Sequence, residues 1–101
     1  MEDDMPTYIS LVNLTEEGIK NVKESPQRFD AFKKALQAAG GRVIVVYLTM
    51  GRYDMVLIIE GPSDEAAAAL ALSTASRGAI RTETMKAFTE DQYRGIISKV
   101  A

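Results

Sequence analysis

The side chains best suited to chemistry lie around one turn signal and along one later strand. The run Gly51-Arg-Tyr-Asp54 places a phenol and a carboxylate beside a turn glycine. Such groups, with nearby hydroxyls, can orient a small polar molecule through hydrogen bonds. The ligand-contacting residues expected here are Tyr47, Gly51, Tyr53, Asp54, Thr82 and Thr84. Asp54 carries the most weight, because a carboxylate on a largely apolar face needs a partner.

Each of these residues also has a purely architectural interpretation. Gly51 can serve the turn alone, and Tyr53 can pack in the core. Asp54 can hydrogen-bond backbone groups, or Tyr47 across the strand. The two threonines are common strand formers. The sequence leaves both interpretations open.

Two groups of charged residues allow similar alternatives. Lys20, Lys23 and Arg28 either form a cationic rim for a small anion or make up a solvated helix face. Arg81 and Glu83 share one face of a predicted strand and suit cross-strand or inter-subunit ion pairs better than catalysis.

The composition excludes several classes of chemistry. The chain has no Cys and no His, so disulfides, thiol nucleophiles and thiolate metal sites are impossible, and the commonest general base is missing. We expect no metal and no cofactor. One alternative is a cofactor-free enzyme of the dimeric α/β barrel type that acts on a small organic substrate. Its active site would then use Tyr47, Asp54 or Asn13. Another is a tautomerase using Pro6 as its N-terminal base, which residues 1–4 argue against.

Length and charge indicate one small acidic domain. The 101 residues carry a net charge of -2 and no basic block, so we expect no nucleic-acid partner. The apolar runs are too short to span a membrane, and we expect a cytoplasmic protein. Residues 1–5 are predicted to be a disordered tail and residues 6–101 a single domain, with Met1 and Met5 both possible starts.

A hairpin over residues 42–60 is the central structural prediction. Two apolar, strand-length runs flank Met50-Gly51, which we expect to form a two-residue turn that pairs Val46 with Met55. Alternation then puts one apolar set toward the helices: Ile44, Val46, Leu48, Tyr53, Met55, Leu57 and Ile59. The opposite face has an apolar centre: Val43, Val45, Val56 and Ile58. That second face is too apolar to be left in water.

The remaining segments complete a recognisable order. Strands are expected over residues 8–14 and 79–88, and helices from Thr15 to Gly40 with a break at Ser25-Pro26, and from Ser63 to about Ala75. A capping box at residues 89–92 opens a last helix. The order β-α-β-β-α-β with an extra C-terminal helix predicts an α+β, ferredoxin-like fold with both long helices on one face of an antiparallel sheet. The uncovered apolar face then predicts sheet-to-sheet dimerisation into a dimeric α/β barrel.

Ordered motifs over about residues 5–88 resemble those of the GYD-domain family of small ferredoxin-like proteins. They are Thr15-Glu-Glu-Gly18, Ser25-Pro-Gln-Arg28, Gly40-Gly41, Gly51-Arg-Tyr-Asp54 and Gly78-Ala-Ile-Arg-Thr-Glu-Thr84. The resemblance implies the fold but no established reaction.

The same hairpin motif and last strand also resemble, more loosely, the effector-binding domain of Lrp/AsnC-type regulators. That resemblance implies a homodimer or higher homo-oligomer that binds an amino acid between subunits near Gly51, Tyr53 and Asp54. No helix-turn-helix precedes the domain, so we do not expect a complete regulator. The leading hypothesis is a small-molecule-binding or sensory domain with an interface pocket beside the 51–54 hairpin. There are two alternatives: an enzyme, and a structural or partner-binding module.

Overall fold

Four strands and four α-helices make up the chain in the computed structural model, which describes residues 5–101. The tail predicted to be disordered falls mainly on residues 1–4, outside the described part. The elements, with a short 3-10 turn η1, are β1 (Thr7–Leu14), α1 (Glu16–Lys20), η1 (Val22–Glu24), α2 (Ser25–Ala38), β2 (Arg42–Leu48), β3 (Met55–Glu60), α3 (Asp64–Ala75), β4 (Ile80–Ala87) and α4 (Glu90–Ile97).

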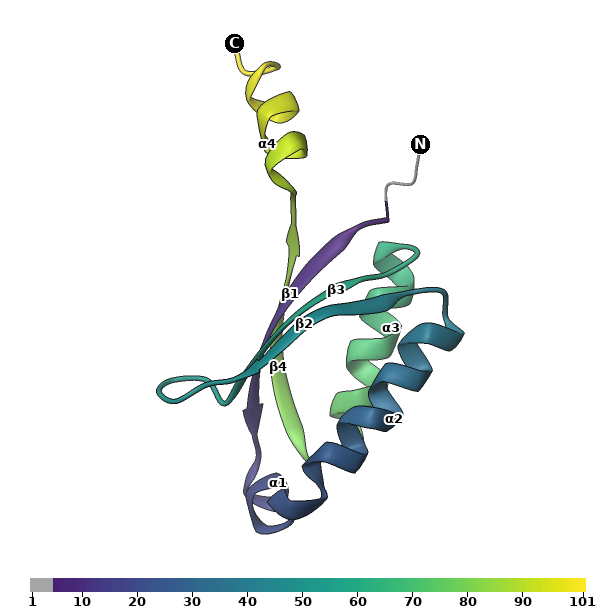
Figure 1. Ribbon diagram of the computed structural model, residues 1–101, viewed down its shortest axis with the longest axis vertical. Helices are drawn as coiled ribbons and strands as arrows, with labels where there is room; N and C mark the ends of the chain where they lie inside the picture. The colour runs from purple at the N-terminus through teal and green to yellow at the C-terminus, as the bar shows by residue number, and fades with distance from the viewer. Residues whose placement is uncertain (1–4) are drawn as a thin grey trace.

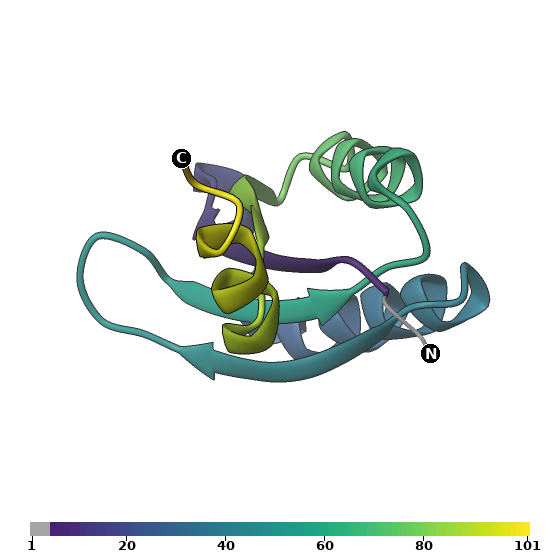
Figure 2. The ribbon, with the colours of Figure 1, turned by 90° about the horizontal axis from the view of Figure 1, so that it is seen from above.

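The strands form one antiparallel sheet in the order β2-β3-β1-β4. Helices α2 and α3 lie on the same side of this sheet, α2 over β2 and α3 over β4 (Figures 1 and 2). The predicted ferredoxin-like α+β architecture is therefore confirmed, with strands one and three in the centre. No helix in the described residues is long and apolar enough to cross a bilayer.

The hairpin turn is longer than the sequence predicts. Leu48 faces Met55, and the Thr49 amide donates to the Asp54 carbonyl oxygen at 2.8 Å, so residues 50–53 form a four-residue loop. The prediction of a two-residue turn was therefore wrong. Because the register moves by two residues, most side chains keep their predicted faces. Gly51 has φ of +128°, which supports its predicted role as the turn glycine.

A β-bulge at Ile44 corrects the predicted faces of β2. Val43 pairs with Ile59 and Val45 pairs with Ile58, which leaves Ile44 unpaired between them. Val43 consequently packs against the core, whereas Ile44 is 43% exposed. Leu48 continues past the end of the helical layer and is 82% exposed. The helix-facing placement predicted for Ile44, and the burial implied for Leu48, were therefore wrong.

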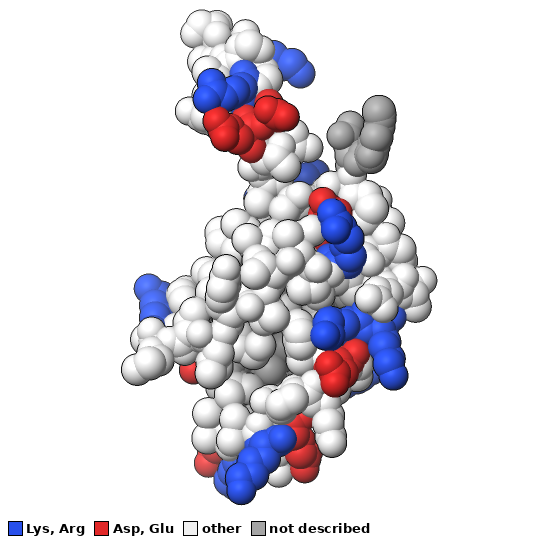
Figure 3. Space-filling model, in the orientation of Figure 1, with Lys and Arg blue, Asp and Glu red and all other residues white. Residues whose placement is uncertain are grey.

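The sheet separates a covered face from an open one. The core between sheet and helices contains Tyr8, Val12, Leu36, Leu57, Ile59 and Ala67. Neither α2 nor α3 covers the other side, which we call the open face; its apolar residues are Ile9, Leu11, Val45, Val56, Ile58 and Met85. In the view of Figure 3, charged side chains gather on α4 and around the helices, and the area over the strands between them is uncharged.

Helix α4 extends away from the rest of the molecule (Figure 1). Its capping box is formed as predicted, with Thr89 and Gln92 bonding reciprocally to each other's backbone amides. One side carries an exposed apolar stripe: Tyr93, Ile96, Ile97 and Val100. The radius of gyration is 14.8 Å, against about 13 Å for a compact domain of this size. The single chain therefore leaves apolar surface at both α4 and the open face.

A buried tyrosine ties three elements together at one end of the sheet. The Tyr8 hydroxyl on β1 donates to Asp64 in the first turn of α3, and Lys86 on β4 donates to the same carboxylate at 3.1 Å. Burial, then the bond to Asp64, raises the pKa of Tyr8 to about 12. The bonds from Tyr8 and then Lys86 lower the pKa of Asp64.

Replacing this tyrosine tests the link through pH. We expect Tyr8→Phe to lower the free energy of unfolding by about 1 kcal/mol at pH 7, because Asp64 loses a donor. The raised pKa means that the stabilising contribution of Tyr8 is present below pH 10 and is lost as pH rises toward about 12. Urea unfolding at pH 7 and pH 11 measures both effects. The gap between the two proteins should shrink at pH 11; a constant gap would contradict the assignment.

Candidate functional site

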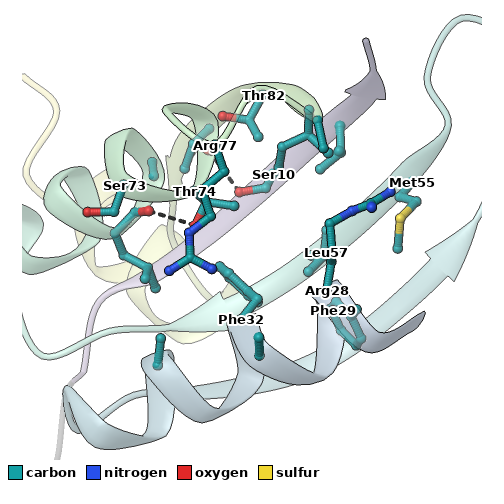
Figure 4. Close-up of a pocket in the computed structure, with 18 of the residues that line it drawn as sticks. Ser10, Arg28, Phe29, Phe32, Met55, Leu57, Ser73, Thr74, Arg77 and Thr82 are labelled. Carbon is teal, nitrogen blue, oxygen red and sulfur yellow. Dashed lines mark hydrogen bonds between the residues drawn. The ribbon is translucent and has the colours of Figure 1, made fainter. Parts of the chain in front are cut away.

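A cavity of about 370 Å³ lies between the sheet and the two long helices. We call it the inner cavity (Figure 4). Its floor comes from β1, β3 and β4: Ser10, Val12, Leu14, Met55, Leu57, Ile59, Ile80, Thr82 and Thr84. Its walls come mainly from α2 and α3: Arg28, Phe29, Phe32, Ala35, Leu70, Ala71 and Thr74, with Arg77 just beyond α3.

The cavity follows from the side chains that the two helices offer to the sheet. Helix α3 presents Ala67 and Ala71, whose methyl groups are too short to fill the space over the central strands. Helix α2 offers Phe29 and Phe32, whose rings stack at a centroid distance of 6.1 Å and line one wall. Large side chains on one helix and small ones on the other leave an apolar hollow between the layers.

Hydroxyl groups provide most of the polar surface on the cavity floor. Ser10 on β1 and Thr84 on β4 share a hydrogen bond of 2.8 Å between their hydroxyl oxygens. On the wall, the Thr74 hydroxyl donates to the Leu70 carbonyl oxygen at 2.8 Å. Among residues 5–101, the Thr82 hydroxyl makes no recorded hydrogen bond to the protein. A ligand in the cavity would find Thr82 available as a donor or acceptor.

Two arginines stand at the cavity (Figure 4). Arg28 belongs to the first turn of α2, where it donates to Glu24 at 3.4 Å and to the Asn21 carbonyl at 3.2 Å. Arg77 follows the end of α3, and within the described residues its guanidinium makes no recorded hydrogen bond or ion pair. Within the part of the chain that the structure describes, the cavity lining contains no Asp, Glu, Lys or His. The site can bind a small molecule through its hydroxyl and guanidinium groups.

A second, smaller depression lies on the open face. We call it the outer pocket; it has about 280 Å³ and is lined by Leu11, Asn13, Tyr53, Arg81, Thr82 and Glu83. The Tyr53 hydroxyl donates to Glu83 at 2.7 Å, and this bond is the main reason that the pKa of Tyr53 is raised. Tyr53 therefore does not pack in the core beneath the helices, as its predicted face had implied.

Asp54 finds its partner in the backbone of β1. Its carboxylate accepts from the Leu14 amide at 2.9 Å, and its own amide donates to the Val12 carbonyl at 2.8 Å. These bonds attach the hairpin to the end of β1 and confirm the backbone-bonding interpretation. Tyr47 is 61% exposed, and Gly51 lies at the exposed loop tip.

The structure thus divides the six predicted site residues between different places. Thr82 and Thr84 line the inner cavity, whereas Tyr53 borders the outer pocket and Thr82 contributes to both. The prediction of a ligand beside the hairpin remains a prediction. Ser10 and Arg77 were not predicted as site residues; the available signal for Arg77 was a cation just after a helix rich in alanine.

Comparison with known proteins places the chain in a family. The family model described as "GYD domain" matches residues 8–97. The chain belongs to the GYD-domain family. A curated relative from Thermus thermophilus, named "Glutamine synthetase and cystathionine beta-lyase binding protein", is 34% identical over 84 residues, covering 82% of this chain and 88% of the relative. The resemblance drawn from the ordered motifs is confirmed.

Solved structures show the fold of this GYD domain in other settings. A feast or famine regulatory protein of M. tuberculosis, complexed with L-methionine, has a TM-score of 0.62 at 14% identity over 83% of this chain. A leucine response regulatory protein of Mycobacterium tuberculosis gives 0.62 at 13% identity over 83% of this chain. The GYD chain spans only 50% and 51% of those two chains. A protein from Thermus thermophilus gives 0.53 at 24% identity, over 84% of this chain and 95% of its own.

Proposed function

We propose that this GYD domain is a homo-oligomeric small-molecule-binding or sensory domain that holds its ligand in the inner cavity. One observation carries the proposal: a cavity of about 370 Å³ has apolar walls and a few convergent polar groups. Small-molecule sites have this character and run from about 300 to 1,000 Å³. A protein with the same fold is complexed with L-methionine, and this supports a small molecule as the ligand class.

The open face supports the homo-oligomeric part of the proposal. Its apolar centre would remain in water in a single chain, and a second copy packed face to face would cover it. The outer pocket lies on the same face, so a partner subunit would also close the space beside Tyr53 and Glu83. An interface ligand near the 51–54 hairpin is therefore part of the proposal as a second, smaller site.

A sensory role follows from the strand that the two pockets share. Thr82 on β4 contributes to the inner cavity and to the outer pocket. A ligand bound in the inner cavity, on the helix-covered side of β4, could shift this strand and so alter the open face on which a partner subunit packs. Such a change can transmit ligand binding to subunit association only if the two associated states bind the ligand with different affinity.

A neutral apolar probe tests whether the inner cavity binds small molecules. We expect octanol to perturb amide resonances of α2, α3 and β1 in a titration followed by NMR. Ala71→Phe should abolish these shifts, because the new ring occupies the cavity. Ala69→Phe is the matched control: it lies on the same helix, is exposed and does not line the cavity. Shifts retained in Ala71→Phe, or absent from the wild type, would overturn the proposal.

A second candidate function is binding to a metabolic enzyme. The name of the Thermus thermophilus relative states that it binds glutamine synthetase and cystathionine beta-lyase. The exposed apolar stripe on α4 gives this chain a surface suited to a protein partner. Titration of purified glutamine synthetase distinguishes the candidates, since a partner-binding module would bind the enzyme whether or not the cavity is blocked by Ala71→Phe.

A further inference from the structure

The charges around the inner cavity differ from those of the chain as a whole. The chain has 14 acidic and 12 basic residues. Yet among residues 5–101, the cavity lining contains two arginines and no acidic residue. The cavity therefore has a local excess of positive charge in an acidic protein. An anionic ligand would be favoured there, and a cationic one disfavoured.

The two arginines lie at the same end of the cavity. Helix α2 begins at this end and α3 finishes there, beside α1 (Figure 1). Arg28 in the first turn of α2 and Arg77 after α3 therefore both line the cavity; in Figure 4 the side chain of Arg77 extends toward Phe32 and that of Arg28 toward Met55. The rest of the lining between them is mostly apolar, with hydroxyls on the floor. A ligand with one charged end and an apolar body fits this division.

The available bonding capacity points to a carboxylate as the charged end. Guanidinium groups bind carboxylates through paired, parallel hydrogen bonds. Arg28 is 32% exposed, and its one acidic neighbour, Glu24, is an exposed residue one helical turn away at 3.4 Å. That contact is long and weak enough to be exchanged for a ligand. Within residues 5–101, the guanidinium of Arg77 makes no hydrogen bond or ion pair that a ligand would have to displace.

We infer that the inner cavity binds an apolar carboxylate, with its hydrocarbon body against Phe29, Phe32 and Leu57 and its carboxylate at the end of the cavity that Arg28 and Arg77 line. This inference rests on the proposed function, because it names the chemical class of the cavity ligand. Thr82 provides an additional hydroxyl for a ligand with a second polar group.

Three probes of equal chain length test the inference: octanoate, octanol and octylammonium. Calorimetric titration of the whole chain should show octanoate binding at least about tenfold more tightly than octanol, and octylammonium the weakest. Arg77→Gln and Arg28→Gln should each reduce octanoate affinity by about tenfold, since each removes a charge-assisted contact. Both variants should leave octanol affinity unchanged. Raising the salt concentration should weaken octanoate binding alone.

Arg94→Gln is the matched control, because Arg94 is exposed on α4 and lines neither the inner cavity nor the outer pocket. It should leave octanoate affinity unchanged. Equal affinity for octanoate and octanol, or an equal loss in Arg94→Gln and Arg77→Gln, would overturn the carboxylate inference and leave the cavity as a binding site. Binding of none of the three probes would overturn the proposed function as well.

Discussion

Gly18→Ala is expected to destabilise the protein by about 3 kcal/mol, at the upper end of the cost of overpacking. Gly18 lies in α1, where alanine would ordinarily be favoured over glycine by about 1 kcal/mol. A methyl group at this position would collide with the Ala79 carbonyl and lie 3.3 Å from Leu14 Cδ2. The Ala79 carbonyl oxygen accepts from the Thr15 amide at 3.0 Å, so it cannot retreat without losing that bond. Sterics and helix propensity therefore predict opposite signs.

Thermal unfolding measures the outcome directly. A loss of this size should lower the Tm by about 15 °C in a domain of about 100 residues. Gly95→Ala is the control, because Gly95 also lies in a helix and, among the described residues, no side chain or other element lies within 4 Å of the added carbon beyond its own chain neighbours. It should cause no loss of stability. An unchanged or raised Tm in Gly18→Ala would show that α1 does not pack on the β4 end as described.

Ile58→Lys should convert the proposed oligomer into a monomer. Ile58 lies in the middle of the open face, with Ile9 on β1 and Val45 on β2 as its cross-strand neighbours. In a single chain, the lysine would extend into water at little cost. In a face-to-face dimer, its charge would be buried against the partner without a counterion, which is strongly unfavourable.

Light scattering at low micromolar concentration distinguishes the two states. The wild type should have at least twice the 11.0 kDa mass of one chain, and Ile58→Lys should have the mass of one chain with its circular dichroism retained. Gln37→Lys, which adds the same charge on the exposed side of α2, should keep the wild-type mass. A wild type that is monomeric would contradict the assembly proposed from the open face.

The elements of the fold were predictable because local signals mark their ends. Thr15, Ser63 and Thr89 each accept a hydrogen bond from a backbone amide in the first turn of the following helix. Gly40 and Gly78 adopt positive φ where α2 and α3 have ended. The bulge at Ile44 was not predictable, because a run of four β-branched residues fits either register equally well. The length of the hairpin loop was not predictable either, because a turn glycine does not fix the number of residues in the loop.

The candidate site was less predictable than the fold. Its cavity arises from the mismatch between the alanines of α3 and the aromatic side chains of α2, and sequence periodicity contains no measure of the space between two helices. Arg28 was considered for an anion site together with Lys20 and Lys23, but its partner at the cavity is Arg77. These two arginines are separated by 49 positions in the sequence (77 minus 28), and both line the cavity because α2 begins at the end of the sheet where α3 finishes (Figure 1).

The central position of β1 has a consequence for how the chain folds. This strand is made before the rest of the sheet, but its two neighbours are β3 and β4, at residues 55–60 and 80–87. Its hydrogen-bonding edges therefore stay unpaired until most of the domain has left the ribosome. Contacts between such distant segments slow folding and expose unpaired strand edges in the meantime. Completion of the sheet is thus an event that follows synthesis of the domain, and the early chain is the form most exposed to aggregation.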